Sequence, residues 1–470
     1  MQNRLNNKLT VFSLIMITVV SVDSVRNLPA AALFGSQLVF FYLMSALLFL
    51  IPCALISAEL SSAWPEQGGI YIWIKKAFGP QLGLLAIWLQ WIENVIWYPT
   101  ILSFVAGSIG YLINPELATN KIFLIIIVLS SFWGCTFVNL KGITTSAKFS
   151  TFCTIAGLLL PMGLIIGLGA AWFFSNKPTE ISLTLTNMIP NTQDSSTWVA
   201  LTGIMLSFCG VEIATVHARD VNNPQRAFPK ALIFSAIIIL VTLIFGSLSL
   251  ALVVPSQKIS LVSGIMQAFD TFVRPYNLSW LLPFLSLTLV IGGLGSVSNW
   301  IIAPTKGLLV AAQDGLLPPS LQKENKNAAP SNLLIYQAII VTCLTMVFLI
   351  FSSVNASYWL LTVLAAQLYM FMYILMFTAA IYLRIKYPNQ PRPFKVPGGL
   401  FGLSVISIAG IIGSTITFIV GYIPPSTIEI GKIRTFEFLL ISGFIVMCLP
   451  PFISYYFRSR KLALPITQPT

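Results

Sequence analysis

Apolar stretches long enough to cross a bilayer dominate the sequence and limit what it can fold into. A membrane-spanning α-helix needs about 20 predominantly apolar residues. The pattern therefore predicts an all-α integral membrane protein with 12 transmembrane helices in one transmembrane domain, 1–470. The expected spans are 9–33, 37–60, 81–113, 121–140, 146–174, 196–217, 229–254, 280–312, 332–352, 356–384, 399–423 and 434–457.

Composition excludes the main water-soluble classes of protein. Hydrophobic residues make up 56% of the 470 residues and charged residues only 9%, whereas soluble domains carry about 25% charged residues. This balance excludes a soluble enzyme, a secreted disulfide-rich scaffold and a DNA-binding domain. The six cysteines show no CxxC spacing and His217 is the only histidine. We therefore expect no metal site, no disulfide framework and no cofactor.

The positive charge fits membrane topology better than nucleic-acid binding. With a cytoplasmic N-terminus, 19 lysines and arginines fall on the cytoplasmic side and six on the opposite side. Cytoplasmic loops of membrane proteins carry such an excess. We therefore predict that both termini are cytoplasmic, and we attribute the net charge of +12 to this asymmetry and not to a nucleic-acid partner.

Two predicted spans, the first and the sixth, are interrupted by polar residues near mid-membrane. The first contains Asp23 and Arg26, followed by Pro29, whose nitrogen cannot donate a hydrogen bond. The sixth contains Gly210 and Glu212. Corresponding interruptions in two halves of a chain are typical of transporters with inverted repeats. The alternative is that both are kinks sealed by neighbouring helices.

Asp23 and Arg26 allow two interpretations. They are three residues apart, close enough to pair on a helix, so they could form a structural salt bridge. In the functional interpretation Arg26 offers its planar guanidinium to a substrate carboxylate, while Asp23 attracts an amino group. Both interpretations hold if the pair exchanges partners with the substrate.

Two further acidic residues are candidates for the interior, where each charge needs a partner or a function. Glu93 adjoins Asn94 in an aromatic and polar segment that suits a cavity wall. Glu212 is the candidate proton carrier, because removal from water favours the neutral carboxyl group. The alternative for Glu212 is a permanently neutral structural donor. Glu59 is expected at the end of the second span, away from substrate.

Aromatic residues supply two more candidates. Small and polar residues surround Trp300, which could stack on a substrate or cover it as a gate. Tyr369, with Tyr373 and Gln367, forms a polar stripe in the tenth span, where core packing is an equal alternative.

Several segments of the chain carry recognisable motifs: 59–73 with 79–80, 210–212, 223–224, 263–267, 299–307 with 317–318, and 392–399. Together they resemble the amino acid-polyamine-organocation (APC) superfamily of transporters, and most closely its bacterial glutamate:γ-aminobutyrate antiporters. The resemblance covers nearly all of 9–457, in order.

The resemblance implies a LeuT-like fold with a five-plus-five inverted repeat. The first repeat would be 9–174, the second 196–384, and helices 11 and 12 would occupy 399–457. Transport would proceed by alternating access around broken helices 1 and 6. The resemblance also implies a bacterial cytoplasmic (inner) membrane.

In this family the substrate carboxylate binds at the helix 1 break and the amino group at the helix 6 break, as half-helix dipoles favour. Trp300 resembles a gating aromatic of helix 8, and Glu212 matches a carboxylate associated with proton sensing. Glu212 and Glu93 are the candidates for proton coupling. The candidate substrate contacts are Val22, Asp23, Ser24, Arg26, Glu93, Phe208, Cys209, Gly210, Trp300 and Tyr369.

Three features depart from the family pattern. The usual glycine-rich break of helix 1 is replaced by 21–26, so we expect Arg26 to take part in carboxylate binding. The middle of helix 5 has no lysine, which some relatives use in place of sodium. The segment after helix 12, 458–470, is too short to resemble a C-terminal plug, and we expect no acid-gated plug.

The leading hypothesis is a secondary amino acid antiporter that exchanges glutamate or a related amino acid for an amine or another amino acid. The alternatives are a proton-coupled symporter and a non-transporting nutrient sensor. An intramembrane enzyme is disfavoured, because the chain lacks an acid–base cluster. The expected partners are a small amino acid or amine and the lipid bilayer. The sequence leaves open whether two copies of the chain form a homodimer.

Overall fold

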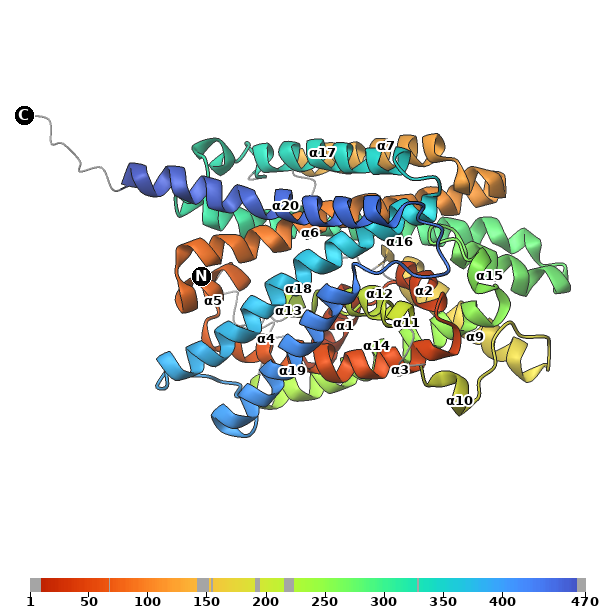
Figure 1. The fold of residues 1–470 in the computed structure, drawn as a ribbon, viewed down its shortest axis with the longest axis horizontal. Coiled ribbons are helices and arrows are strands. Elements are labelled where there is room, and N and C mark those ends of the chain that lie inside the picture. The colour runs from red at the N-terminus through yellow and green to blue at the C-terminus, as the bar shows by residue number, and fades with distance from the viewer. Residues whose placement is uncertain are drawn as a thin grey trace, which may run out of the picture.

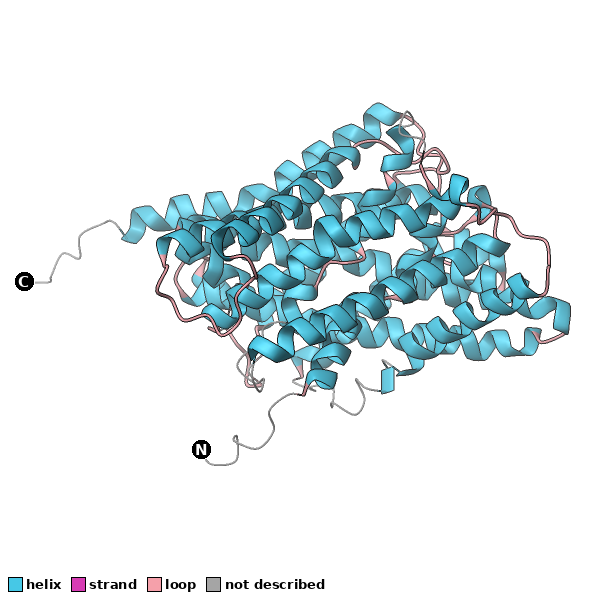
Figure 2. Cartoon of the chain, turned by 90° about the horizontal axis from the view of Figure 1, so that it is seen from below, coloured by secondary structure: helices cyan, strands magenta, loops and turns pink. Residues whose placement is uncertain are grey.

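The computed structural model describes residues 10–66, 68–141, 152–153, 155–190, 195–214, 224–327 and 329–462. All regular structure in these ranges is helical (Figure 2). The α-helices are α1 (Val11–Val22), α2 (Leu28–Ala32), α3 (Leu38–Ser45), α4 (Ile51–Ala63), α5 (Ile70–Phe78), α6 (Pro80–Ile113), α7 (Lys121–Leu140), α9 (Leu160–Phe174), α10 (Leu185–Met188), α11 (Ser195–Trp198), α12 (Ala200–Leu206), α13 (Val211–Ala214), α14 (Pro224–Val253), α15 (Gly264–Val273), α16 (Leu282–Gln313), α17 (Ser331–Thr345), α18 (Val354–Lys386), α19 (Gly399–Val420) and α20 (Ile433–Leu462).

Shorter helical segments extend or connect these helices. Two are π-helical, η4 (Ala46–Leu50) and η6 (Ile155–Leu159), and they lead directly into α4 and α9. The 3-10 segments are η2 (Val25–Asn27), η3 (Gly35–Gln37), η5 (Pro115–Thr119), η8 (Ser256–Lys258), η9 (Arg274–Tyr276), η10 (Ser279–Leu281), η11 (Pro319–Gln322) and η12 (Met346–Leu349).

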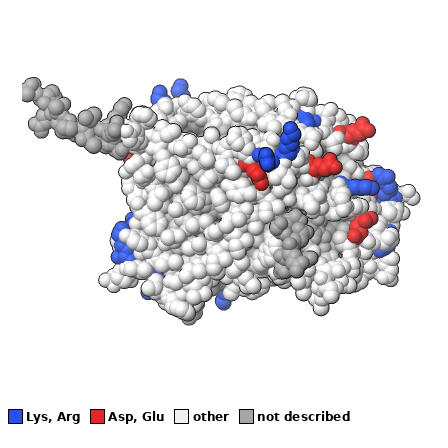
Figure 3. All heavy atoms as spheres, viewed as in Figure 1, with Lys and Arg blue, Asp and Glu red and all other residues white. Residues whose placement is uncertain are grey.

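The helices form a membrane domain. Among the described residues, 10 helices are long and apolar enough to cross a bilayer, or up to 11 spans if the bent helix pair at the N-terminus counts as one. Helices α7, α17 and α20 run nearly along the long axis of the molecule (Figure 1). A wide band of the surface lacks charged side chains, which gather toward the right-hand part and the left edge of the view (Figure 3). The all-helical membrane architecture is thus confirmed.

The predicted number of 12 spans is not reached in the part of the chain that the structure describes. The predicted sixth span, 196–217, is divided into α11, α12 and α13. It then continues into 215–223, which lies outside the described residues and includes His217. None of these short helices is long enough to cross a bilayer alone, so they do not count as a span.

The predicted break in the first span is present. Helix α1 ends at Val22, and the backbone of Asp23 and Ser24 is extended before η2 and α2 resume helical structure. The two halves are bent by 42° relative to each other. Pro29 lies in the first turn of α2, where its missing N–H costs no hydrogen bond. The polar run therefore separates two helical halves as its sequence predicts.

The predicted break in the sixth span is present as well. Helix α12 ends at Leu206, and a turn of four residues follows before α13 begins at Val211. Gly210 closes this turn with φ = 102°, a backbone conformation that a residue with a Cβ rarely adopts. The glycine thus ends one half-helix and allows the next to start in a new direction.

Helix α5 was not predicted from the sequence, because segments 59–73 and 79–80 were used only as evidence of the family resemblance. Two glycines with positive φ, Gly68 and Gly69, precede it. Lys75 in α5 forms an ion pair with Asp314 at the end of α16, and the Tyr71 hydroxyl donates to the same carboxylate. Burial works to raise the pKa of Asp314, but the bonds from Lys75 and Tyr71 outweigh it and leave that pKa below its usual value. Helix α15 was likewise not predicted.

A buried ionic cluster ties α4 to the C-terminal end of α18. Glu59 accepts hydrogen bonds from Arg384 Nε at 2.8 Å and from the backbone N–H of Val396 at 2.7 Å. Arg392 Nε lies 3.3 Å from the same carboxylate, and the side chains of Glu59 and Arg392 are only 4% and 2% exposed. Glu59 lies away from the cavity described below, as predicted, but it is a buried ion-pair partner and not merely an end-of-helix residue.

Replacing Glu59 with glutamine should destabilise the fold strongly. Glu59→Gln removes the negative charge that both guanidinium groups face, and breaking a buried pair by removing one partner costs about 3 to 5 kcal/mol. We expect a clear fall in the thermal unfolding midpoint of the detergent-purified protein. Glu66→Gln is the matched control, because Glu66 pairs with Lys76 at the surface. Equal midpoints for the two variants would contradict the assigned role of Glu59.

Candidate functional site

A small cavity with a partly polar lining lies at the break of the first span. Helices α6, α16 and α18 and the break in the sixth span complete its wall. The lining residues are Val20, Val22, Asp23, Ser24, Arg26, Asn27, Glu93, Asn94, Trp97, Leu206, Cys209, Ser296, Trp300 and Tyr369. The structure thus brings together most of the candidate substrate contacts predicted from the sequence.

Phe208 and Gly210 do not line this cavity, although the family pattern placed them among the substrate contacts. The Phe208 side chain is fully buried and packs edge-to-face on Tyr42, with ring centroids 5.8 Å apart. The Gly210 N–H donates to the hydroxyl of Tyr373 at 3.1 Å. Of the predicted residues at this break, only Cys209 reaches the cavity, and its thiol donates to the carbonyl of Met205.

Arg26 is buried and held by neutral groups. Its Nη1 donates to Thr100 Oγ1 at 2.8 Å and to the Tyr358 hydroxyl at 3.1 Å, and its Nη2 donates to Asn27 Oδ1 at 3.0 Å. The guanidinium lies 5.6 Å from the ring centre of Trp97. Its Nε is buried without a hydrogen-bond partner. Since a guanidinium binds carboxylates through two parallel N–H groups, this environment favours an anionic ligand.

Asp23 is held by a different helix. Its Oδ2 accepts a hydrogen bond of 2.7 Å from Thr242 of α14, whereas its Oδ1 is buried without a partner. Among the described residues, none of the ion pairs joins Asp23 to Arg26. The structural salt bridge considered from the sequence is therefore absent from this conformation, because extended backbone at the break separates the two side chains.

Glu93 and Trp300 line the cavity from α6 and α16. Glu93 is 4% exposed and accepts a hydrogen bond from the side chain of Asn94 at 3.1 Å. The backbone carbonyl of Trp300 accepts from the Tyr98 hydroxyl at 2.9 Å, which fixes this part of α16 against α6. The Trp300 ring lies 6.1 Å from that of Trp97, so the two indoles flank the cavity together.

Glu212 is enclosed by hydrogen-bond donors from α6 and α18. Gln90 Nε2 and the Tyr369 hydroxyl donate to its Oε1 at 3.0 and 2.9 Å. The Tyr373 hydroxyl donates to its Oε2 at 2.5 Å. Tyr373 therefore bridges the carboxyl group of Glu212 and the backbone N–H of Gly210 at the break in the sixth span.

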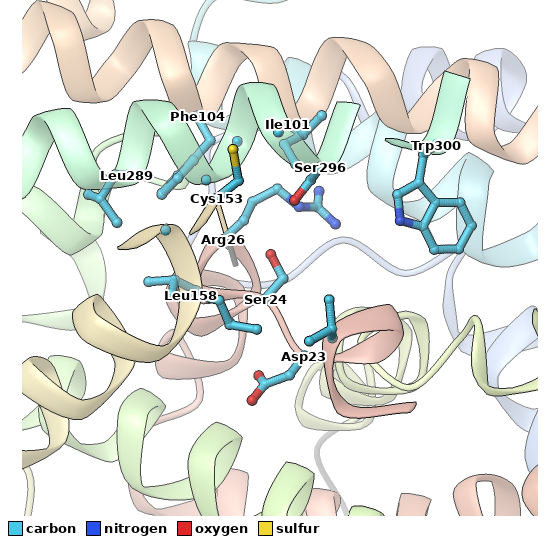
Figure 4. Close-up of a pocket in the computed structure, with 16 residues that line it drawn as sticks. Asp23, Ser24, Arg26, Ile101, Phe104, Cys153, Leu158, Leu289, Ser296 and Trp300 are labelled. Carbon is cyan, nitrogen blue, oxygen red and sulfur yellow. The ribbon is translucent and has the colours of Figure 1, made fainter. Parts of the chain in front are cut away.

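A second small cavity adjoins the first. It shares Asp23, Ser24, Arg26 and Trp300 with the first cavity (Figure 4). Ser24, Arg26 and Ser296 give it a polar side, whereas its far wall is apolar. That wall is formed by Ile101, Phe104, Leu158 and Leu289.

Close approach of two glycines fixes part of the wall of the second cavity. A Cβ added to Gly157 in η6 would lie 2.0 Å from Gly292 Cα in α16, so only glycine permits this contact. The backbones of η6 and α16 therefore pack directly against each other.

Sequence reasoning missed several residues of the site. Gln90 precedes Glu93 by three residues and Asn94 by four, a spacing that places them on one helix face. That spacing could have marked Gln90 in advance. Thr100, Thr242 and Tyr358 stand in ordinary apolar helices, and only the packing of distant helices identifies them.

Replacing Tyr373 with phenylalanine should destabilise the break in the sixth span. Tyr373→Phe removes a donor to Glu212 and the acceptor of the Gly210 N–H. Leaving a buried polar group without a partner costs about 1 to 3 kcal/mol. We expect a lower thermal unfolding midpoint than for Tyr382→Phe, the control on the same helix, whose side chain is 43% exposed. A similar midpoint for both variants would argue against the bridge.

A cavity with buried charges at two interrupted helices is typical of transporters with inverted repeats, and this protein has that arrangement. The sequence matches the amino acid permease family over residues 9–446. The chain belongs to this family of the APC superfamily, and is thus a multi-pass membrane transporter of amino acids or amines and not an enzyme. Both the predicted superfamily and the predicted absence of enzymatic function are confirmed.

Related proteins span nearly the whole chain. An uncharacterized transporter of Legionella pneumophila is 44% identical, covering 96% of this chain and 97% of its own. A glutamate/γ-aminobutyrate antiporter of Lactococcus lactis is 31% identical, covering 97% of this chain and 91% of its own. A probable agmatine/putrescine antiporter of the same species is 23% identical, covering 98% and 97%.

Proposed function

We propose that the protein is an amino acid antiporter that exchanges glutamate or a related amino acid for an amine or another amino acid. The observation that carries the proposal is the charge of the cavity. It presents the guanidinium of Arg26 together with the carboxyl groups of Asp23 and Glu93. Such a site suits a ligand that carries both a carboxylate and an ammonium group.

Within the cavity the proposal assigns roles by charge. Arg26 binds the substrate carboxylate, aided by Ser24 at the break. Asp23, whose Oδ1 is buried without a partner, and Glu93 receive the amino group. Trp300 and Tyr369 cover the substrate from α16 and α18, while Val22 and Cys209 contact its apolar part.

Alternating access would operate on the two interrupted spans. We propose that 9–174 and 196–384 form two inverted repeats, with 399–457 outside them. Matching interruptions at Asp23 and at Gly210 support this division. With the excess of lysines and arginines on one side, the proposal places both termini in the cytoplasm of a bacterial cell.

Similarity to named relatives supports the choice of substrates. Relatives named as glutamate/γ-aminobutyrate antiporters are 31% and 32% identical to the chain. The more distant relative named for agmatine and putrescine carries amines. An amino acid exchanged for an amine or for an amino acid agrees with both names.

Exchange can be distinguished from uptake in proteoliposomes. Vesicles loaded with unlabelled γ-aminobutyrate should take up labelled glutamate at least tenfold faster than empty vesicles, because an obligatory exchanger returns only with a bound ligand. Equal uptake by loaded and empty vesicles would overturn the exchanger and favour a symporter. Ligand binding without flux in either case would favour a nutrient sensor.

Proton-coupled symport is the second candidate, and the position of Glu212 favours it. Its buried carboxyl group receives donors from Gln90, Tyr369 and Tyr373, and it adjoins the break in the sixth span. A change in its protonation would alter these bonds next to the substrate cavity. Glu93, which lines the cavity itself, is the second proposed group for proton coupling.

Glu212→Gln should flatten the pH dependence of transport. Glutamine cannot titrate, so the variant should show the same flux from pH 5 to pH 8 while the wild type changes with pH. Glu324→Gln is the control, because Glu324 is exposed outside the spans. Flux of labelled glutamate in proteoliposomes gives the measurement. A pH profile of Glu212→Gln that matches the wild type would remove Glu212 as proton carrier.

A further inference from the structure

We propose that Arg26 couples the substrate carboxylate to movement of the C-terminal half of the first span, η2 and α2. The carboxylate is then needed for the exchange step and not only for affinity. This inference rests on the proposed exchange function and deepens it, since it names the chemical group that exchange requires.

Arg26 lies where such coupling can occur. It belongs to η2, directly after the extended residues of the break, and it lines the cavity. Its Nη1 donates to Thr100 on α6 and to Tyr358 on α18. One guanidinium therefore connects a half-helix to two long helices and to the substrate cavity.

Among the described residues Arg26 forms no ion pair, although Glu93 in the same cavity interacts with its charge at longer range. Its protein partners are two hydroxyl groups, one amide oxygen and the ring of Trp97, and its Nε has none. A carboxylate accepts two parallel N–H···O bonds from one guanidinium group, which a single hydroxyl group cannot do. A substrate carboxylate would therefore compete with Thr100 and Tyr358 for the same N–H groups.

Asp23 does not take this role, because it is held apart. Its Oδ2 is bonded to Thr242 on α14, and its side chain leaves the break in a direction different from that of Arg26 (Figure 4). The acidic and basic groups of the break are thus attached to different helices. An amine at Asp23 or Glu93 leaves the bonds of Arg26 to α6 and α18 in place.

Competition at Arg26 has a conformational consequence. A ligand shifts an equilibrium between two conformations only through its different affinity for them. A carboxylate binds better when the guanidinium is released from Thr100 and Tyr358, so it favours the conformation in which η2 and α2 are free to move. An amine without a carboxylate occupies the cavity without this effect and acts as an inhibitor. The exchange partner must then itself carry a carboxylate, as γ-aminobutyrate does, which narrows the proposed function.

The test compares γ-aminobutyrate with n-butylamine, which has the same amine and chain length without the carboxylate. Binding is followed by thermal shift, exchange by counterflow in proteoliposomes, and conformation by the rate at which a methanethiosulfonate reagent modifies Cys209, read by mass spectrometry. Cys209 lines the same cavity as Arg26. For the wild type we expect both compounds to bind and to shield Cys209, but only γ-aminobutyrate to exchange and to change the modification rate beyond the shielding that n-butylamine gives.

Removing the two hydroxyl groups that accept from Arg26 gives a second experiment, which needs no ligand. In the double variant Thr100→Val, Tyr358→Phe, Cys209 should be modified without ligand at a rate about tenfold different from that of the ligand-free wild type. The change should go in the same direction as the one that γ-aminobutyrate causes in the wild type. This size is expected for the loss of a hydrogen bond to a charged group. The control double variant is Thr378→Val, Tyr382→Phe, which changes the same residue types at exposed positions of α18. It should keep the wild-type rate.

The outcomes separate this inference from the function on which it rests. Exchange of n-butylamine as fast as γ-aminobutyrate, or an unchanged ligand-free rate in the Thr100→Val, Tyr358→Phe variant, would overturn the role of Arg26 and leave the antiporter standing. Absence of exchange with every amino acid tested, despite the expected shift in that variant, would overturn the antiporter while supporting Arg26 as the connection between α2, α6 and α18.

Discussion

Ionic groups in a low-dielectric interior must find partners, and this requirement organises the molecule. At one end of α18, the charge of Glu59 is matched by Arg384 and Arg392 in a buried cluster. At the break of the first span the opposite holds, because Arg26 and Asp23 each keep a buried polar atom without a partner. Buried pairs that are fully compensated are costly to break, whereas uncompensated groups are available to a ligand. The first arrangement holds two helices together, and the second leaves polar groups at the cavity where we propose that substrate binds.

The two interruptions show how local sequence and distant packing share the work. Extended backbone at Asp23 and Ser24 and the positive φ of Gly210 are local properties, which the polar run and the glycine already indicate. The environment of each break comes from elsewhere in the chain: α14 holds Asp23, α6 and α18 hold Arg26, and α18 reaches Glu212 and Gly210 through Tyr373. Helix α18 thus contacts both interruptions, and two residues of its predicted polar stripe, Tyr369 and Tyr373, supply the bonds to Glu212.

The sequence predicted the spans and the breaks well, because both depend on properties of short segments: apolar length, proline, glycine and charge. It was less successful where a residue's orientation depends on tertiary contacts. Phe208 lies beside Cys209, yet its ring packs on Tyr42 while the thiol faces the cavity. Helix α5 was missed because nine residues are too few for a span, and its position depends on contacts with α16. The alternatives for Asp23 and Arg26 could be separated only by knowing which helices pack beside each of them.

The contact between Gly157 and Gly292 limits the direction in which the second cavity can change. Two backbones that already touch cannot approach further, so this seam between η6 and α16 acts as a mechanical stop. The seam therefore sets a lower limit on the distance between η6 and α16, and so on the width of this compartment.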